Sequence, residues 1–368
     1  MFLQKEDDFT INYMTNKIPA LSNGNLTIEE LSRKRILLKD EIKQIEINHD
    51  VVSLLENFSR SSFQARNIGR AAKLYLSKSY KDMGIIWSLA GSLFSAGLRE
   101  ITIEAIRNNL VDVLVCTGAL FEQDMLEALG HKHYACEPDQ DDSELQKLKI
   151  DRIYDHLLDE MALQQVDRTF QRISASLPEG NYSSREFMKH TGKWLSNAAG
   201  VKDSVITTAY ELNVPIFIPA LNDSSIGIGI AMDCELNNRN VVIDSIKDLR
   251  EMALLKYRCG DTGIIFVGGG VPKNYSQDSV VIAEMLGYKV RKHKFGIQIS
   301  TADTRDGGLS GSTLKEAISW NKNDSAIEEM MIWGEATVYF TLLVSYVYKM
   351  RENNKRKGKN LANIFESK

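Results

Sequence analysis

Short apolar runs that end in small residues, each followed by a stretch with helical periodicity, recur along the 368-residue chain. Three of them are GIIWSLAG at 84–91, VDVLVCTGAL at 111–120 and TGIIFVGGG at 262–270. Strands that are apolar on both faces and alternate with helices are typical of a parallel sheet that is covered on both sides. The pattern therefore predicts an α/β fold with a Rossmann-like parallel sheet flanked by helices on both faces. Ligands of such a sheet bind at the carboxyl ends of its strands.

Further segments extend this alternation. Three more apolar runs are predicted to form strands, namely VPIFIPALNDSSIG at 214–227, NVVIDS at 240–245 and FGIQISTA at 295–302. Apolar residues spaced by three and four positions predict an amphipathic helix over Ser62–Lys78. The apolar stretch Val338–Val347 has only about half the length of a membrane span, so we expect a buried helix there.

The chain divides into three parts by composition and periodicity. Residues 1–50 are polar and irregular, and we expect an N-terminal extension that contains a helix capped by Thr27. Residues 51–350 are expected to form a single large domain. Residues 351–368 are basic and lose helical periodicity, which favours a solvated C-terminal tail over a binding arm.

The composition excludes several functional classes. The 45 Lys and Arg residues nearly balance the 49 Asp and Glu residues, and this near-neutral charge argues against nucleic acid as a partner. The four cysteines are far apart in sequence, so we expect reduced thiols in a cytoplasm rather than disulfides or a zinc site. No apolar run suits a signal peptide or a membrane span, so no membrane partner is expected. The six histidines lack metal-ligand spacing, so we expect no metal.

The segment 295–322 carries the clearest chemical signal. A glycine- and serine-rich loop follows the predicted strand, and a short helix begins near Thr313. Glu316 and Trp320 share a face of this helix, and Lys322 follows its end. A carboxylate and an indole both attract ammonium groups, and a neutral, enclosed lysine is the nucleophile that imine formation requires. Two simpler interpretations are a capping box between Thr313 and Glu316 and a surface lysine lying along the tryptophan ring.

Three other strand ends carry glycine or acidic residues. The three glycines at 268–270 let the backbone approach a phosphate, although they could equally form a tight strand exit. Asp223 is suited to hold a ribose hydroxyl or to cap a turn. Glu122 and Asp124 could contact a polyamine, but acids are also favoured in the first turn of any helix.

Taken together, these segments resemble the deoxyhypusine synthase family from about Ser62 to about Met350. The matching phrases, in chain order, are SFQARNIGRA, SAGLRE, VDVLVCTG, IDRIYD, VPIFIPALNDSSIG, GGGVPKN, GGLSG, EAISWNK and GEATVYFTLLV. GGVPKN and GGLSG are more similar to the prokaryotic branch, which includes deoxyhypusine synthase-like and homospermidine synthase-like proteins. The resemblance implies that residues 51–350 form an NAD-binding catalytic domain.

The resemblance also implies a reaction. NAD accepts a hydride from spermidine, the resulting imine loses diaminopropane, and the butylimine passes to an active-site lysine. The group then passes to an acceptor amine and is reduced by the same NADH. The acceptor is a lysine of a hypusine-bearing translation factor in deoxyhypusine synthases, and putrescine in homospermidine synthases. Family members form homotetramers with the active sites at subunit interfaces, and an N-terminal segment can cover a neighbouring site.

The resemblance assigns roles to individual positions. Lys322 matches the catalytic nucleophile. The positions that match NAD-binding residues are Ser92, Ser95, Thr117, Gly118, Asp223, Gly269, Thr301, Ala302, Asp306, Glu335 and Ala336. The expected substrate-binding positions are Glu122, Gln123, Asn274, Gly307, Gly308, Glu316 and Trp320.

Several positions depart from the family pattern, and most departures remove acidic or polar groups. Family acids are replaced by Gln123, Ile228 and Leu309, a histidine by Asn274, the glycine before the nucleophile by Asn321, and the usual aspartate by Glu335.

These departures leave three functions open. The first is a deoxyhypusine synthase that modifies a protein lysine, and the second is a homospermidine synthase that uses putrescine. The third is a non-catalytic paralogue that serves as a binding or regulatory subunit. The retained Lys322, Glu316 and Trp320 count against the third.

Overall fold

The computed structural model describes residues 27–38, 42–79, 82–201, 203–351 and 356–366. It divides into two compact units, Met1–Lys43 and Gln44–Lys368. The first contains α1 (Ile28–Leu37), which begins at the predicted cap. The Thr27 Oγ1 accepts a hydrogen bond from the Glu30 N–H, and the Glu30 carboxylate accepts one from the Thr27 N–H. The predicted N-terminal helix is therefore confirmed.

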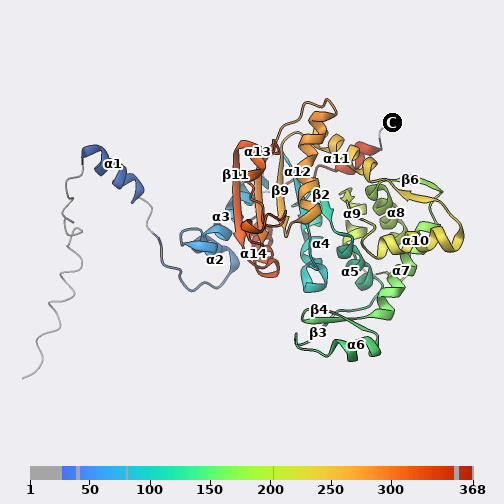
Figure 1. Cartoon of the computed structure of the whole chain (residues 1–368). Coiled ribbons are helices and arrows are strands. Elements are labelled where there is room, and N and C mark those ends of the chain that lie inside the picture. Colours follow the sequence, from blue (N-terminus) through green and yellow to red (C-terminus); the bar gives the residue numbers. More distant parts are fainter. Residues whose placement is uncertain (1–26, 39–41, 80–81, 202, 352–355, 367–368) are drawn as a thin grey trace, which may run out of the picture. The chain divides into compact units, whose positions relative to one another are not determined.

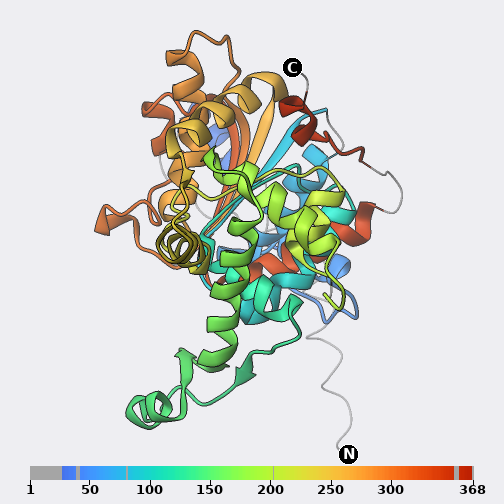
Figure 2. The same ribbon diagram turned by 90° about the vertical axis from the view of Figure 1, so that its right-hand side faces the viewer.

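The second unit is built around a six-stranded sheet in the order β11-β10-β9-β1-β2-β7. Every pairing in this sheet is parallel, and helices lie on both of its faces (Figure 1 and Figure 2). The predicted α/β class and Rossmann-like parallel sheet are thus confirmed. The strands are β1 (Gly84–Leu89), β2 (Val113–Cys116), β7 (Ile216–Phe217), β9 (Thr262–Val267), β10 (His293–Ser300) and β11 (Asn323–Trp333).

The helices that follow or precede these strands complete the unit. They are α2 (Val51–Phe58), α3 (Phe63–Ser79), the π-helix η1 (Phe94–Leu98), α4 (Arg99–Arg107), α5 (Gly118–Ala128), α6 (Asp142–Leu148), α7 (Glu160–Ala175), α8 (Ser184–Ser196), α9 (Val205–Glu211), α10 (Ser225–Asn237), α11 (Ser245–Cys259), α12 (Gly270–Met285), the 3-10 turn η2 (Thr304–Asp306), α13 (Glu316–Ser319), α14 (Ala336–Met350) and the 3-10 turn η4 (Leu361–Phe365). None of the helices in the described ranges is both long and apolar enough to cross a membrane.

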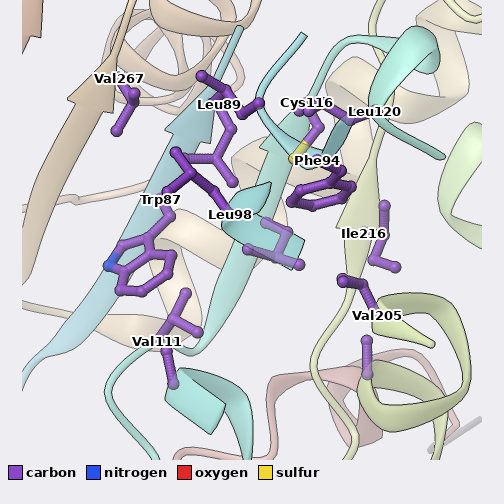
Figure 3. Packing of buried hydrophobic residues seen from close by; sticks show 14 of the residues in the cluster. Trp87, Leu89, Phe94, Leu98, Val111, Cys116, Leu120, Val205, Ile216 and Val267 are labelled. Atoms are coloured by element: carbon purple, nitrogen blue, oxygen red, sulfur yellow. The ribbon is translucent and has the colours of Figure 1, made fainter. Parts of the chain in front are cut away.

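The two faces of the sheet carry separate apolar clusters because side chains alternate along each strand. On one face, Trp87 and Leu89 of β1 share a cluster with Phe94 and Leu120 (Figure 3), and residues of α3, α4, α5 and α14 belong to the same cluster. The centroids of the Trp87 and Phe340 rings are 4.9 Å apart in an edge-to-face arrangement. On the other face, Ile86 joins a smaller cluster with residues of α11 and α12. Buried strands with an apolar residue on each face explain why their sequences are almost continuously apolar.

The outer edge of β11 is covered by α3. The Asn67 Nδ2 donates a hydrogen bond to the Met331 carbonyl at 3.1 Å, and the Trp333 N–H donates one to Gln64 Oε1 at 2.9 Å. Side chains of α3 thereby satisfy main-chain groups that an edge strand would otherwise present to another chain.

Two strand predictions were incomplete. Residues 240–245 form β8 (Val241–Ile243), but it pairs with β6 (Gly180–Tyr182) in a separate two-stranded sheet. The strand β11 was not predicted, because most of its residues are polar or exposed and it lacks the apolar run of an interior strand. A third sheet, formed by β3 (Tyr134–Ala135), β5 (His156–Asp159) and β4 (Ile150–Ile153), projects with α6 from the rest of the unit (Figure 2).

The prediction of a solvated C-terminal tail was wrong for residues 356–366. The Arg356 guanidinium pairs with the buried Asp112 carboxylate and donates to the Asn109 and Met83 carbonyls. Leu361 is buried in the smaller apolar cluster. Arg356, one of the basic residues that suggested solvation, is therefore neutralised inside the fold.

Candidate active site

A cavity of 570 Å³ lies at the carboxyl ends of the parallel strands. Segments that follow β1, β2, β9 and β10 line it, together with the loop before α10 and the first residues of α14. This is the edge at which parallel α/β sheets bind ligands, and the volume is in the range of small-molecule sites.

Glycines shape the floor of this cavity where β9 turns into α12. Gly268 has a φ of +72°, and a Cβ atom there would lie 2.6 Å from the Ala90 carbonyl oxygen. A Cβ on Gly269 would lie 2.3 Å from the Ser310 Cα atom. Larger residues are thus excluded from this turn, and α12 begins at the cavity without a side-chain cap. A helix N-terminus presented in this way is suited to a phosphate group.

Eight of the eleven residues expected to bind NAD line this cavity. They are Thr117, Gly118, Asp223, Gly269, Thr301, Ala302, Glu335 and Ala336. The other three are placed outside its lining. The Ser95 hydroxyl donates to the Ser92 carbonyl and contacts His156 Nε2, whereas the Asp306 carboxylate accepts a hydrogen bond from the Gly308 N–H.

Two polar groups of the cavity differ in their availability. The Thr117 Oγ1 is buried and has no hydrogen-bond partner within the described ranges, so it is free to bind a ligand. Glu335 instead caps α14, accepting hydrogen bonds from the Thr337 and Val338 N–H groups. Burial opposes ionisation of Glu335, but the hydrogen bonds from Thr337 and Val338 outweigh it and lower the pKa of this carboxyl.

A second cavity, of 390 Å³, contains Lys322. Five of the eight positions expected to be catalytic or substrate-binding line it, and they are Asn274, Gly307, Glu316, Trp320 and Lys322. The capping interactions expected as the simpler interpretation are also present. The Thr313 Oγ1 accepts from the Glu316 N–H, and the Glu316 carboxylate accepts from the Thr313 N–H.

The Lys322 side chain is 12% exposed, and its nitrogen is surrounded by polar and aromatic groups. The Nζ donates a hydrogen bond to Asn274 Oδ1 at 2.8 Å and pairs with Asp278 Oδ1 at 2.9 Å. It also lies 5.6 Å from the centre of the Trp320 ring, which is within cation–π range. The lysine is thus an enclosed amine rather than a surface side chain.

The segment that separates the two cavities is the loop 307–312, which is held by Lys273. The Lys273 Nζ is buried and donates hydrogen bonds to the Leu309 carbonyl at 2.9 Å and to the Ser312 Oγ at 2.7 Å. The pKa of Lys273 is lowered to about 8, mainly by burial and also by the charge of Lys322. The charge of Glu316 acts in the opposite direction. Helix α12 borders both cavities, because Gly270 lines the larger cavity and Asn274 lines the cavity that contains Lys322.

Three expected substrate-binding residues line neither cavity. Gly308 lies in the loop, and the Glu122 carboxylate accepts a hydrogen bond from the Ser225 N–H at the start of α10. Burial raises the pKa of Glu122, and the negative charges of Asp167 and Asp223 raise it further. Hydrogen bonds from Ser225 lower this pKa but do not cancel the effect of burial. The Gln123 side chain is buried and accepts a hydrogen bond from the Ser95 N–H, which explains how an amide is accommodated where the family has an acid.

Two residues of this site were not identified from the sequence. Asp278 and Lys273 both belong to α12, and both act on groups that are distant in sequence. The available signal was helical spacing, since Asp278 follows Asn274 by four residues and must share its face. No group of His, Cys, Asp and Glu side chains suited to a metal ion is found in the described part of the chain.

The fold and these cavities define a parallel α/β protein with a glycine-floored ligand site next to an enclosed lysine. The family model for deoxyhypusine synthase matches residues 53–347, and the chain belongs to this family. It is 45% identical over 345 residues to a deoxyhypusine synthase-like protein of Chlorobaculum tepidum, covering 92% of this chain and 98% of that protein. A deoxyhypusine synthase-like protein of Coxiella burnetii is 41% identical over 353 residues, covering 94% of this chain and 99% of that protein.

A solved structure supports the fold. A crystal structure assigned to deoxyhypusine synthase from Entamoeba histolytica superposes with a TM-score of 0.58 at 18% identity, covering 87% of this chain and 99% of that chain.

Proposed function

We propose that this protein transfers the 4-aminobutyl group of spermidine, through an imine on Lys322, to a lysine of a hypusine-bearing translation factor. The observation that carries the proposal is the position of Lys322 in an enclosed cavity that shares α12 and the loop 307–312 with the glycine-floored cavity. A nucleophilic amine next to a dinucleotide-type site is what an oxidation followed by group transfer requires.

The residues of the larger cavity fit NAD as the cofactor. The start of α12 is suited to the pyrophosphate, Asp223 to a ribose hydroxyl, and the unpartnered Thr117 hydroxyl to a further polar group. When bound, NAD would take a hydride from the amine substrate and return it after transfer. Gly268 and Gly269 let this turn pack closely against the Ala90 carbonyl and against Ser310, two residues that also line the cavity.

The lysine cavity supports a polyamine substrate. Glu316 and Asp278 supply two carboxylates, and the Trp320 ring is 65% exposed and available to a second ammonium group. Ammonium groups spaced by short alkyl chains match this combination of acids and apolar surface.

The second candidate is transfer to putrescine, which would make the protein a homospermidine synthase. It is favoured by Ile228 and Leu309, which are 50% and 43% exposed where the family has acids. Fewer acids reduce the attraction for a long polycation and leave room for a smaller acceptor.

We further propose a homotetramer with active sites at subunit interfaces. Val271, Trp333 and Val338 are large apolar side chains that are 42–55% exposed, and Val271 lines the larger cavity. Apolar side chains grouped at a ligand site are typical of a surface that a second subunit covers. Native mass spectrometry should give a single tetrameric species.

Mass spectrometry after borohydride trapping tests the function. The native chain, given NAD and isotope-labelled spermidine, should carry the label on Lys322. With a translation-factor substrate the label should move to the protein lysine, whereas a homospermidine synthase would move it to putrescine and give homospermidine. A Lys322→Arg chain keeps the charge and should give neither adduct nor product.

The three functions give different results in this experiment. Label on Lys322 that passes only to putrescine would select the second candidate. Label on neither enzyme nor product would select the non-catalytic paralogue. Transfer by the Lys322→Arg chain would overturn the role of this lysine.

A further inference from the structure

Lys322 belongs to a closed cycle of three polar side chains. Its Nζ donates to Asn274 Oδ1 at 2.8 Å and pairs with Asp278 Oδ1 at 2.9 Å. The Asn274 Nδ2 completes the cycle by donating to Asp278 Oδ2 at 2.7 Å. Because Asn274 and Asp278 lie one turn apart on α12, the helix fixes the lysine nitrogen against both.

The other charged groups near Lys322 make their hydrogen bonds to other partners. Lys273, from the same helix, is bound to the loop 307–312. The Glu316 carboxylate, from α13, accepts a hydrogen bond from the Thr313 N–H. Asp278 is thus the acid in contact with the Lys322 nitrogen, and its side chain, 29% exposed, also reaches water.

We infer that Asp278 is the proton acceptor and donor for Lys322 during imine transfer, and this inference rests on the proposed function. Lys322 first loses one proton, through Asp278, to solvent. Its neutral nitrogen then attacks the carbon of the protonated substrate imine, the iminium that hydride loss from the secondary amine produces, and the new carbon–nitrogen bond leaves an extra proton on Lys322. Asp278 takes this proton and passes it to the departing nitrogen as the old carbon–nitrogen bond breaks. The leaving group departs as a neutral amine, and Lys322 retains the iminium.

Asn274 has a different role in this cycle. A neutral amide does not exchange a proton with an amine, so Asn274 orients the lysine and the carboxylate without taking part in the transfer. The sequence change at this position, from the family's histidine to Asn274, therefore leaves Asp278 as the titratable partner of the nucleophile.

The substitution Asp278→Asn tests the inference because it removes the charge but keeps the side-chain volume. In the protein without added dinucleotide or polyamine, trace acetic anhydride should label Lys322 at pH 7 about tenfold faster than in the native chain. The reason is that no carboxylate then stabilises the unreactive ammonium form. The rate at which spermidine and NAD give the borohydride-trapped adduct on Lys322 should instead fall about a hundredfold, which is the loss typical of a missing acid–base group. Asp278→Glu restores a carboxylate, so its transfer rate should be at least ten times that of Asp278→Asn.

A matched control is available at another lysine. Asp324 pairs with Lys294 at 2.5 Å and is 26% exposed, close to the value for Asp278. Asp324→Asn should raise the labelling of Lys294, leave that of Lys322 unchanged and preserve transfer.

Recovery of transfer by Asp278→Glu distinguishes this role from a purely structural one, because a cavity loosened by the loss of the Asp278 contacts would also expose Lys322 and raise its labelling. Equal labelling of Lys322 in the native and Asp278→Asn chains, or transfer by Asp278→Asn at the native rate, would overturn the inference. If the native chain gave no spermidine adduct, the proposed function would fail. The labelling comparison would still decide whether Asp278 controls the proton of Lys322.

Discussion

Asn321, directly before Lys322, adopts a left-handed backbone conformation with a φ of 62°. This region is strained for most residues, but glycine and, to a lesser extent, asparagine adopt it. The conformation explains why a glycine is usual in the family at this position and why Asn321 can replace it. The Asn321 side chain also donates a hydrogen bond to Glu284 Oε2 at 2.6 Å. The departure at this position is therefore compatible with the placement of Lys322 that the proposed function requires.

Substitutions at Asn321 should separate backbone conformation from side-chain chemistry. Asn321→Gly keeps the left-handed turn, so the free energy of unfolding should change by less than about 1 kcal/mol, with trapping at Lys322 retained. Asn321→Val places a β-branched residue at positive φ, so the free energy of unfolding should fall by about 2 kcal/mol. The amount of adduct trapped on Lys322 should fall as well. Chemical denaturation and borohydride trapping measure the two effects. Equal trapping by both variants would show that this turn does not position Lys322.

Among the helices and loops, α12 is joined to the loop 307–312 by hydrogen bonds from Lys273. Lys273 is buried, and burial lowers its pKa to about 8, compared with an ordinary value of 10.5. Between pH 8 and pH 10.5 the unfolded chain therefore holds a proton that the folded chain has released. Folding is then favoured as the pH rises through this window.

The pH dependence can be isolated by comparing the native chain with Lys273→Met. Methionine fills the volume but leaves the Leu309 and Ser312 carbonyls without a donor, so the variant should be less stable. The difference in the free energy of unfolding should grow, by on the order of 2 kcal/mol, from pH 8 to pH 10.5. Lys149→Met, at a mostly exposed lysine, provides the control. A native-to-variant difference that stays constant over this pH range would refute the assignment.

The sequence predicted interior elements better than edges and long-range contacts. The strands β1, β2 and β9 are apolar on both faces, so their sequences alone indicate buried parallel strands. By contrast, β11 has a partly exposed face and gave no such pattern. Residues of the larger cavity could be located because they follow strand ends. Asp278 could not, because its role depends on Lys322, 44 positions away, which only the fold brings to 2.9 Å.

For the whole molecule, the buried Arg356–Asp112 pair and the larger cavity lie at opposite ends of the parallel strands. Arg356, in the C-terminal segment, pairs with Asp112, which in turn accepts a hydrogen bond from the Ile85 N–H near the amino end of β1. Both side chains are almost fully buried. The larger cavity opens at the carboxyl ends of the same strands. A change at the first end should therefore alter stability without altering ligand binding.

The substitution Arg356→Ala tests this separation. It leaves the Asp112 carboxylate buried without its cation, so the free energy of unfolding should fall by about 3–5 kcal/mol. Arg305→Ala, which removes an exposed ion pair with Asp303, should cost less than about 1 kcal/mol. At a temperature at which both variants remain folded, the dissociation constant for NAD should match that of the native chain. Weaker NAD binding by Arg356→Ala would mean that the C-terminal segment shapes the ligand cavity as well as the core, since the strands would then transmit the change from one end to the other.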